Sequence, residues 1–152
     1  MNEVPGVVLD AADGAILSIS SNPDVHASLE RILQGSGWDL LKNDTLADSF
    51  ASLQQPNIAI VICDDDLSPG TWREMVRHIS RMDDPPLLIV TARLADERLW
   101  AEALNLGAHD VLARPFDPTE VIRIVGIAHQ RWRNARKPAP GRAKVTMVGA
   151  SI

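Results

Sequence analysis

Short apolar segments alternate with amphipathic segments along this chain, and the alternation occurs five times. The apolar segments are rich in Ile, Leu and Val, which is typical of strands buried on both faces. The amphipathic segments carry apolar residues at helical spacing, between helix-start signals such as Asn22-Pro23 and helix-end signals such as Gly107. The pattern predicts strands at residues 15–19, 38–41, 58–63, 87–90 and 111–113, and helices at about 23–34, 46–53, 72–79, 95–106 and 118–132.

Each predicted strand is followed by a helix, and this order constrains the fold. The strands must be parallel, because each right-handed crossover returns the chain to the same end of the sheet. We therefore expect an α/β fold: a flavodoxin-like, doubly wound, five-stranded parallel sheet with strand order 2-1-3-4-5. The length of 152 residues suits one domain, so we expect an N-terminal extension at 1–14, the domain at 15–132 and a basic, flexible tail at 133–152.

Charge is unevenly distributed along the chain. The net charge is -5, but residues 1–130 contain 20 acidic and 9 basic side chains, while residues 131–152 contain 6 basic and no acidic ones. The basic end has three interpretations: a solvated linker, a contact for an acidic partner, or a nonspecific contact with nucleic acid. We prefer the linker and expect no nucleic-acid partner, because no DNA-reading motif accompanies the basic residues.

The composition also bears on location. No stretch reaches about 18 consecutive apolar residues, and the N-terminus lacks a basic segment followed by an apolar one, so we expect neither a membrane span nor a secretory signal. The single cysteine, Cys63, lies in a predicted strand and cannot form an internal disulfide. This fits a reducing compartment, and we expect a cytoplasmic protein.

Three adjacent carboxylates, Asp64-Asp65-Asp66, follow the third predicted strand. A solvated acidic turn is the simpler interpretation, but three like charges at a buried strand end are costly unless a cation or a reaction uses them. In the order 2-1-3-4-5, the acids would meet the other strand ends: Ser20-Ser21, Thr91-Ala92 and Arg114. An oxygen nucleophile, a hydroxyl donor and a cation together can handle a phosphoryl group.

These strand ends resemble the receiver domain of bacterial response regulators. The resemblance rests on the aspartate after the third strand, on Thr91-Ala92, and on residues 106–117, Leu-Gly-Ala-His-Asp-Val-Leu-Ala-Arg-Pro-Phe-Asp; it covers about residues 15–132. It implies two-component signalling, in which an aspartate accepts a phosphoryl group from a histidine kinase, a phosphotransfer protein or a small phosphodonor while Mg²⁺ assists. It also implies that Thr91, Ala92 and Arg114 bind the phosphoryl oxygens.

Two ways of counting give different acceptors. The family usually has its aspartate four residues before a Pro-Gly pair, which from Pro69-Gly70 points to Asp65. Counting from the end of the strand and from the start of the following helix points to Asp64. We prefer Asp64 and keep Asp65 as the alternative, because the register of a buried strand is set more firmly than the spacing of a turn.

The metal side of the site departs from the family pattern. The family carries two adjacent acids after the first strand, and this chain has Ser20 and Ser21 there. Neutral hydroxyls replace carboxylates poorly as Mg²⁺ ligands, so Asp64 and Asp66 are the remaining candidates and we predict weak Mg²⁺ binding. The lysine of the family is Arg114 here, which keeps the charge but presents a fork of donors.

Three functions follow from these observations. In the first, phosphorylation of Asp64 changes a surface around the fourth helix and fifth strand that contacts a downstream protein. In the second, the domain is a pseudo-receiver that binds its partner independently of phosphorylation. The third is a metal-dependent phosphohydrolase, but the short loops leave little room for a second general acid, so we expect no enzyme. A homodimer stays open as an alternative, and no membrane partner is expected.

Overall fold

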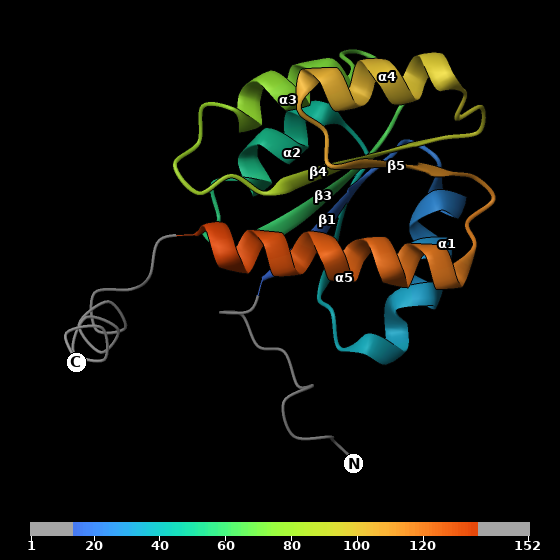
Figure 1. Ribbon diagram of the computed structural model, residues 1–152, viewed down its shortest axis with the longest axis horizontal. Helices are drawn as coiled ribbons and strands as arrows, with labels where there is room; N and C mark the ends of the chain where they lie inside the picture. Colours follow the sequence, from blue (N-terminus) through green and yellow to red (C-terminus); the bar gives the residue numbers. More distant parts are fainter. Residues whose placement is uncertain (1–13, 137–152) are drawn as a thin grey trace.

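Five parallel strands form one sheet in the order β2-β1-β3-β4-β5, which confirms the predicted fold. The computed structural model describes residues 14–136. The strands are β1 (Ala15–Ile19), β2 (Leu40–Asn43), β3 (Ile58–Asp64), β4 (Leu87–Ala92) and β5 (Asp110–Ala113). The helices are α1 (Pro23–Leu33), the short 3-10 helix η2 (Gln34–Ser36), α2 (Leu46–Ser52), α3 (Trp72–Ile79), α4 (Glu97–Leu106) and α5 (Pro118–Ala135). Helices α2, α3 and α4 cover one face of the sheet, and α1 and α5 cover the other (Figure 1).

Helix α1 begins at the predicted Asn22-Pro23 signal, and the other α-helices also begin at residues whose side chains cap them. The Asn22 side chain accepts from the Asp24 N–H, and Thr71 forms a reciprocal capping box with Glu74. Helix α4 begins at residue 97 instead of 95, because the Asp96 carboxylate caps it by accepting from the Leu99 N–H. Each cap supplies a partner for a backbone donor that the first helical turn leaves unpaired.

The second strand lies two residues later than the predicted 38–41. Backbone pairing with β1 begins with Ile16 opposite Leu40. Trp38 precedes the strand, and its ring meets the His129 ring of α5 edge-on, with the centroids 4.6 Å apart. Trp38 is therefore apolar because it packs against helix α5, and not because it belongs to a strand. Composition alone does not distinguish these two roles.

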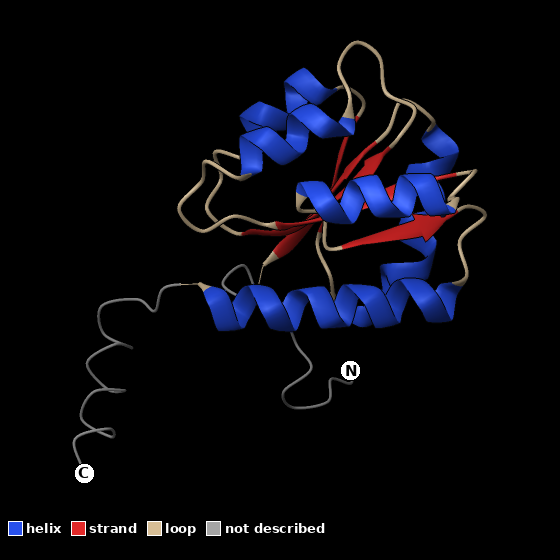
Figure 2. Cartoon of the chain, turned by 45° about the horizontal axis from the view of Figure 1, so that its top comes forward, coloured by secondary structure: helices blue, strands red, loops and turns tan. Residues whose placement is uncertain are grey.

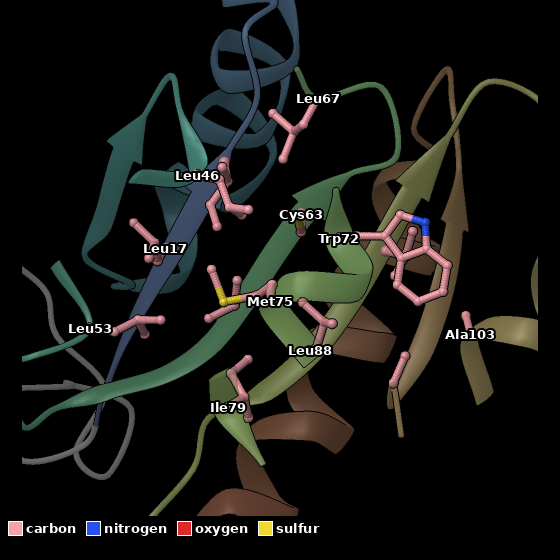
Figure 3. Close-up of a cluster of buried hydrophobic side chains, with 14 of the residues drawn as sticks. Leu17, Leu46, Leu53, Cys63, Leu67, Trp72, Met75, Ile79, Leu88 and Ala103 are labelled. Carbon is pink, nitrogen blue, oxygen red and sulfur yellow. The ribbon is translucent and has the colours of Figure 1, made fainter. Parts of the chain in front are cut away.

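Apolar side chains fill both faces of the sheet. Strand β3 alternates its side chains between the two clusters: Val61 and Cys63 belong to the cluster under α2, α3 and α4, whereas Ile60 and Ile62 belong to the one under α1 and α5. Figure 3 shows the first cluster, where Trp72 and Met75 of α3 lie over the strands. Burial, reinforced by the Asp64 charge, raises the pKa of the Cys63 thiol, which is a protonated core group.

The long helix α5 runs along one side of the sheet (Figure 2). Among residues 14–136, no helix combines the length and the apolarity needed to cross a bilayer. The strand registers align the carboxyl ends of the central strands, with Ile19 beside Cys63, Asp64 beside Thr91, and Ala92 beside Ala113. The residues that end β3 and β4 or follow β1 and β5 therefore meet at one edge.

Candidate functional site

Asp64 ends β3 and is the buried centre of this edge. It is 2% exposed, and both of its carboxylate oxygens accept hydrogen bonds. The Ser20 hydroxyl donates to Oδ2 over 2.8 Å, and Arg114 Nη2 donates to Oδ1 over 2.8 Å. The Asp66 N–H approaches Oδ1 more loosely, at 3.4 Å. The structure thus brings together the predicted residues of three strand ends around one buried charge.

The three adjacent acids occupy different environments. Asp65 lies at the rim: its N–H donates to the Thr91 carbonyl over 2.8 Å, and its Oδ1 is 3.7 Å from Arg114 Nη2. Partial burial and the nearby Asp64 charge raise the pKa of the Asp65 carboxyl, while Arg114 opposes the shift. The Asp66 side chain is exposed. Of the three acids, Asp64 is the one that is both buried and held by two side-chain donors.

Two buried polar atoms lie unsatisfied on the β4 and β5 side of the site. Thr91 is fully buried, and within residues 14–136 its Oγ1 has no hydrogen-bond partner; the same holds for Arg114 Nε. Arg114 is held in place, because its N–H donates to the Ala92 carbonyl over 2.9 Å. A buried donor without a partner is costly, and such atoms at a cleft or strand end indicate a place for the oxygens of a ligand.

The β1 side of the site is a closed hydrogen-bond network. His26 Nε2 is 2.9 Å from the Ser20 carbonyl, which can only accept, so Nε2 is assigned the proton. His26 Nδ1 then accepts from the Ser18 hydroxyl over 2.9 Å. The Ser20 hydroxyl accepts from the Asn22 N–H over 3.0 Å while donating to Asp64. This chain of contacts fixes the hydroxyl that replaces the first acid of the family pattern.

Sequence reasoning missed His26, because the four histidines are far apart in the chain and their spacing suggests no shared site. A signal was present: His26 lies on the buried face of α1 together with Val25, Leu29 and Leu33. A polar side chain on the apolar face of an amphipathic helix needs a hydrogen-bond partner in the core, and here the partners are Ser18 and Ser20 of the β1 side.

The donors around Asp64 do not match what Mg²⁺ requires. The Ser20 hydroxyl directs its proton at Asp64, and Ser21 is exposed. In the part of the chain that the structure describes, no three His, Cys, Asp or Glu side chains group closely enough to hold a metal ion. Mg²⁺ prefers carboxylate oxygens in octahedral geometry, and the side chains on the β1 side of Asp64 do not supply them.

Comparisons with known proteins agree with the geometry. The chain is 28% identical over 139 residues to the transcriptional regulatory protein ZraR of Salmonella typhimurium, a match that covers 90% of this chain and 31% of that protein. It is 24% identical over 125 residues to the KDP operon transcriptional regulatory protein KdpE of Escherichia coli, covering 82% of this chain and 55% of that one. The chain therefore spans about a third to about half of these curated relatives.

Solved structures share the fold. The signal receiver domain of an HD domain-containing protein from Pseudomonas fluorescens Pf-5 superposes with a TM-score of 0.76 at 18% identity, covering 88% of this chain and 99% of that one. The signal receiver domain of a Luxo repressor protein from Vibrio parahaemolyticus gives a TM-score of 0.74 at 16% identity, covering 79% and 92%. The family model for the response regulator receiver domain matches residues 16–126, and the chain belongs to this family of two-component signalling modules.

Proposed function

We propose that this chain is a cytoplasmic receiver in which Asp64 accepts a phosphoryl group from a histidine kinase or a phosphotransfer protein. The observation that carries the proposal is the pair of unsatisfied buried donors, Thr91 Oγ1 and Arg114 Nε, beside the buried Asp64 carboxylate. A phosphoryl group on Asp64 would bring oxygens that accept from both donors. No equivalent gain follows from phosphorylating Asp66, whose side chain is exposed.

The reaction would use the residues of this edge as follows. An oxygen of Asp64 attacks phosphorus, the O–P bond forms, and the P–N bond to the donor histidine breaks with its electron pair going to nitrogen. Arg114 supplies positive charge to the phosphoryl oxygens, and Thr91 donates a hydrogen bond to one of them. Ser20 holds the other carboxylate oxygen, over 2.8 Å, and orients the acceptor.

Phosphorylation of Asp64 would change the surface around α4 and β5. Leu94, which follows Thr91 closely in the chain, is 74% exposed, and Trp100 and Leu104 of α4 are 38% and 44% exposed. Large apolar side chains that gather on one exposed element indicate a protein-binding surface. New contacts at Thr91 and Arg114 would shift the ends of β4 and β5 that border this surface, so we propose a downstream protein as the partner.

A second candidate is a pseudo-receiver that binds its partner without phosphorylation. Both Asp64 oxygens already accept from side chains, and the acids that would hold a metal are replaced by Ser20 and Ser21. A carboxylate satisfied by its own neighbours can serve as a structural anion that keeps one conformation of the surface. In this candidate, Asp64 contributes to stability and receives no phosphoryl group.

Phosphodonor labelling separates the two candidates. The protein is incubated with acetyl phosphate or phosphoramidate, and its intact mass is measured with and without Mg²⁺. The phosphoacceptor proposal expects one added phosphoryl group that Asp64→Ala abolishes and that Asp65→Ala, the matched neighbour, leaves largely intact. Labelling that Asp65→Ala abolishes and Asp64→Ala does not would contradict Asp64 as the acceptor. The absence of labelling both with and without Mg²⁺ would also contradict it, and would favour the pseudo-receiver.

A further inference from the structure

We propose that the Arg114 guanidinium, which lies beside both Asp64 and Asp65, is the resident cation of this site and supplies the positive charge that a divalent metal would otherwise bring. The buried Asp64 charge would then be neutralised by the protein itself, and an anion would bind beside Asp64 without Mg²⁺. The part of this inference that concerns the anion rests on the proposed function, whereas the part that concerns the metal does not.

A single nitrogen of Arg114 lies within reach of both carboxylates. Nη2 is 2.8 Å from Asp64 Oδ1 and 3.7 Å from Asp65 Oδ1. The position is well defined, because the Arg114 side chain is 12% exposed and its backbone N–H is bonded to the Ala92 carbonyl. A second cation that paired with both oxygens would compete with this nitrogen for them.

The charges also favour one cation over two. The Asp64 side chain is 3% exposed, so its charge needs a partner close at hand, and Arg114 supplies it. On the β1 side, where family members carry acids, the Ser20 hydroxyl is buried and already bonded to Asp64, and Ser21 is exposed. A divalent ion placed beside Arg114 would be repelled by the guanidinium, and Asp65 at the rim and the exposed Asp66 would be the carboxylates left to attract it.

The shape of the guanidinium allows one side chain to do two tasks. Its nitrogens are fixed in a planar fork, so Nη2 can neutralise Asp64 while Nε stays available for another acceptor. Nε has no partner among the described residues, and neither does Thr91 Oγ1. A lysine ammonium has its three donors on one nitrogen, whereas the guanidinium spreads its donors over separate nitrogens in a fixed plane. The arginine therefore explains how neutral serines are tolerated on the β1 side.

Metal rescue tests the inference. Melting temperatures of the wild type, Arg114→Ala and Arg93→Ala are measured with MgCl₂ and with NaCl at equal ionic strength. We expect no Mg²⁺-specific shift for the wild type or for the control, because Arg93 is an exposed arginine after the same strand end as Thr91 and leaves the Asp64 contacts in place. Arg114→Ala should melt lower, and saturating Mg²⁺ should raise its melting temperature by about 3 °C, since the two carboxylates regain a cation.

A saturable Mg²⁺ shift in the wild type that Asp64→Asn abolishes would overturn the inference, as would an Arg114→Ala variant that folds and gains nothing from Mg²⁺. If Arg114→Ala does not fold, the wild type still decides. Beryllofluoride, a phosphoryl mimic, should raise its melting temperature equally in Mg²⁺ and in EDTA, and a strict Mg²⁺ requirement would overturn the inference. If beryllofluoride had no effect on the melting temperature, this would count against Asp64 as the acceptor. The Mg²⁺ titration of the wild type would still test whether Arg114 replaces the metal.

Discussion

The two sides of Asp64 are built in opposite ways. Toward β1, each polar atom of the network is paired with another: Ser18 with His26, His26 with the Ser20 carbonyl, and the Ser20 hydroxyl with Asp64. Toward β4 and β5, two buried donors have no partner in residues 14–136. A satisfied network holds one arrangement, whereas unsatisfied donors cost stability until a ligand arrives. The difference assigns support to one side and ligand binding to the other.

The largest change in stability is expected on the β1 side, where the hydrogen-bond network is complete. Replacing His26 by Leu leaves the Ser18 hydroxyl and the Ser20 carbonyl without their partner, and should lower the free energy of unfolding by about 2 kcal/mol. Urea denaturation measures the change. Asp44→Asn is the control: Asp44 Oδ1 is 3.5 Å from His26 Nε2 but 80% exposed, so its removal should have little effect. Equal losses of unfolding free energy in both variants would show that the buried hydrogen bonds of His26 do not account for the loss.

On the β4 and β5 side, removing a polar group should raise the free energy of unfolding instead of lowering it. Thr91→Val keeps the branched shape and removes an unpaired buried hydroxyl. The free energy of unfolding of the ligand-free protein, measured by urea denaturation, should therefore rise by about 1 kcal/mol. Beryllofluoride should then stabilise the variant less than the wild type. The matched control is Ser49→Ala, because the Ser49 hydroxyl is also buried but donates to the Thr45 carbonyl over 2.9 Å, and its loss should destabilise the protein. A destabilised Thr91→Val would mean that its hydroxyl is satisfied in the free protein.

The rim of the site should show a pH dependence. Because the folded state raises the pKa of Asp65, folding favours its protonated form, and the charged form opposes folding once the pH rises through that pKa. Asp65→Asn should therefore raise the melting temperature by about 2 °C at neutral pH, and this gain should vanish as the pH falls below the ordinary pKa of the carboxyl. Thermal melts across the acid range measure the difference. A gain that grows on acidification would contradict the sign of the shift.

The smallest effect is expected from the C-terminal end. Deleting residues 136–152 should leave the melting temperature nearly unchanged, because the deletion removes from the described domain one terminal residue, Arg136, whose guanidinium lies over the Trp132 ring at 4.3 Å from its centroid. A cation–π contact of this kind contributes about 0.5–1 kcal/mol. Arg136→Ala in the full-length chain is the matched variant, and a deletion that costs much more than this substitution would show that residues 137–152 stabilise the domain.

Much of this architecture could be predicted from local patterns. Signals such as Asn22-Pro23, the glycine at position 107 and the apolar run of β3 all act within a few residues, and they located these elements correctly. The predicted second strand was misplaced because Trp38 packs against His129, a partner about 90 residues away in the chain. Local signals cannot report such a distant contact.

The sequence by itself determined the strand order and the set of residues at the carboxyl edge, since parallel β-α repeats leave few ways to arrange five strands. Only the tertiary structure decided how those residues share their contacts: that Asp64 is buried while Asp65 stays at the rim, that one nitrogen of Arg114 reaches both, and that His26 supports Ser20. The physical reason is that a hydrogen bond depends on tenths of an ångström between side chains brought together by strand register, and on burial contributed by helices remote in sequence.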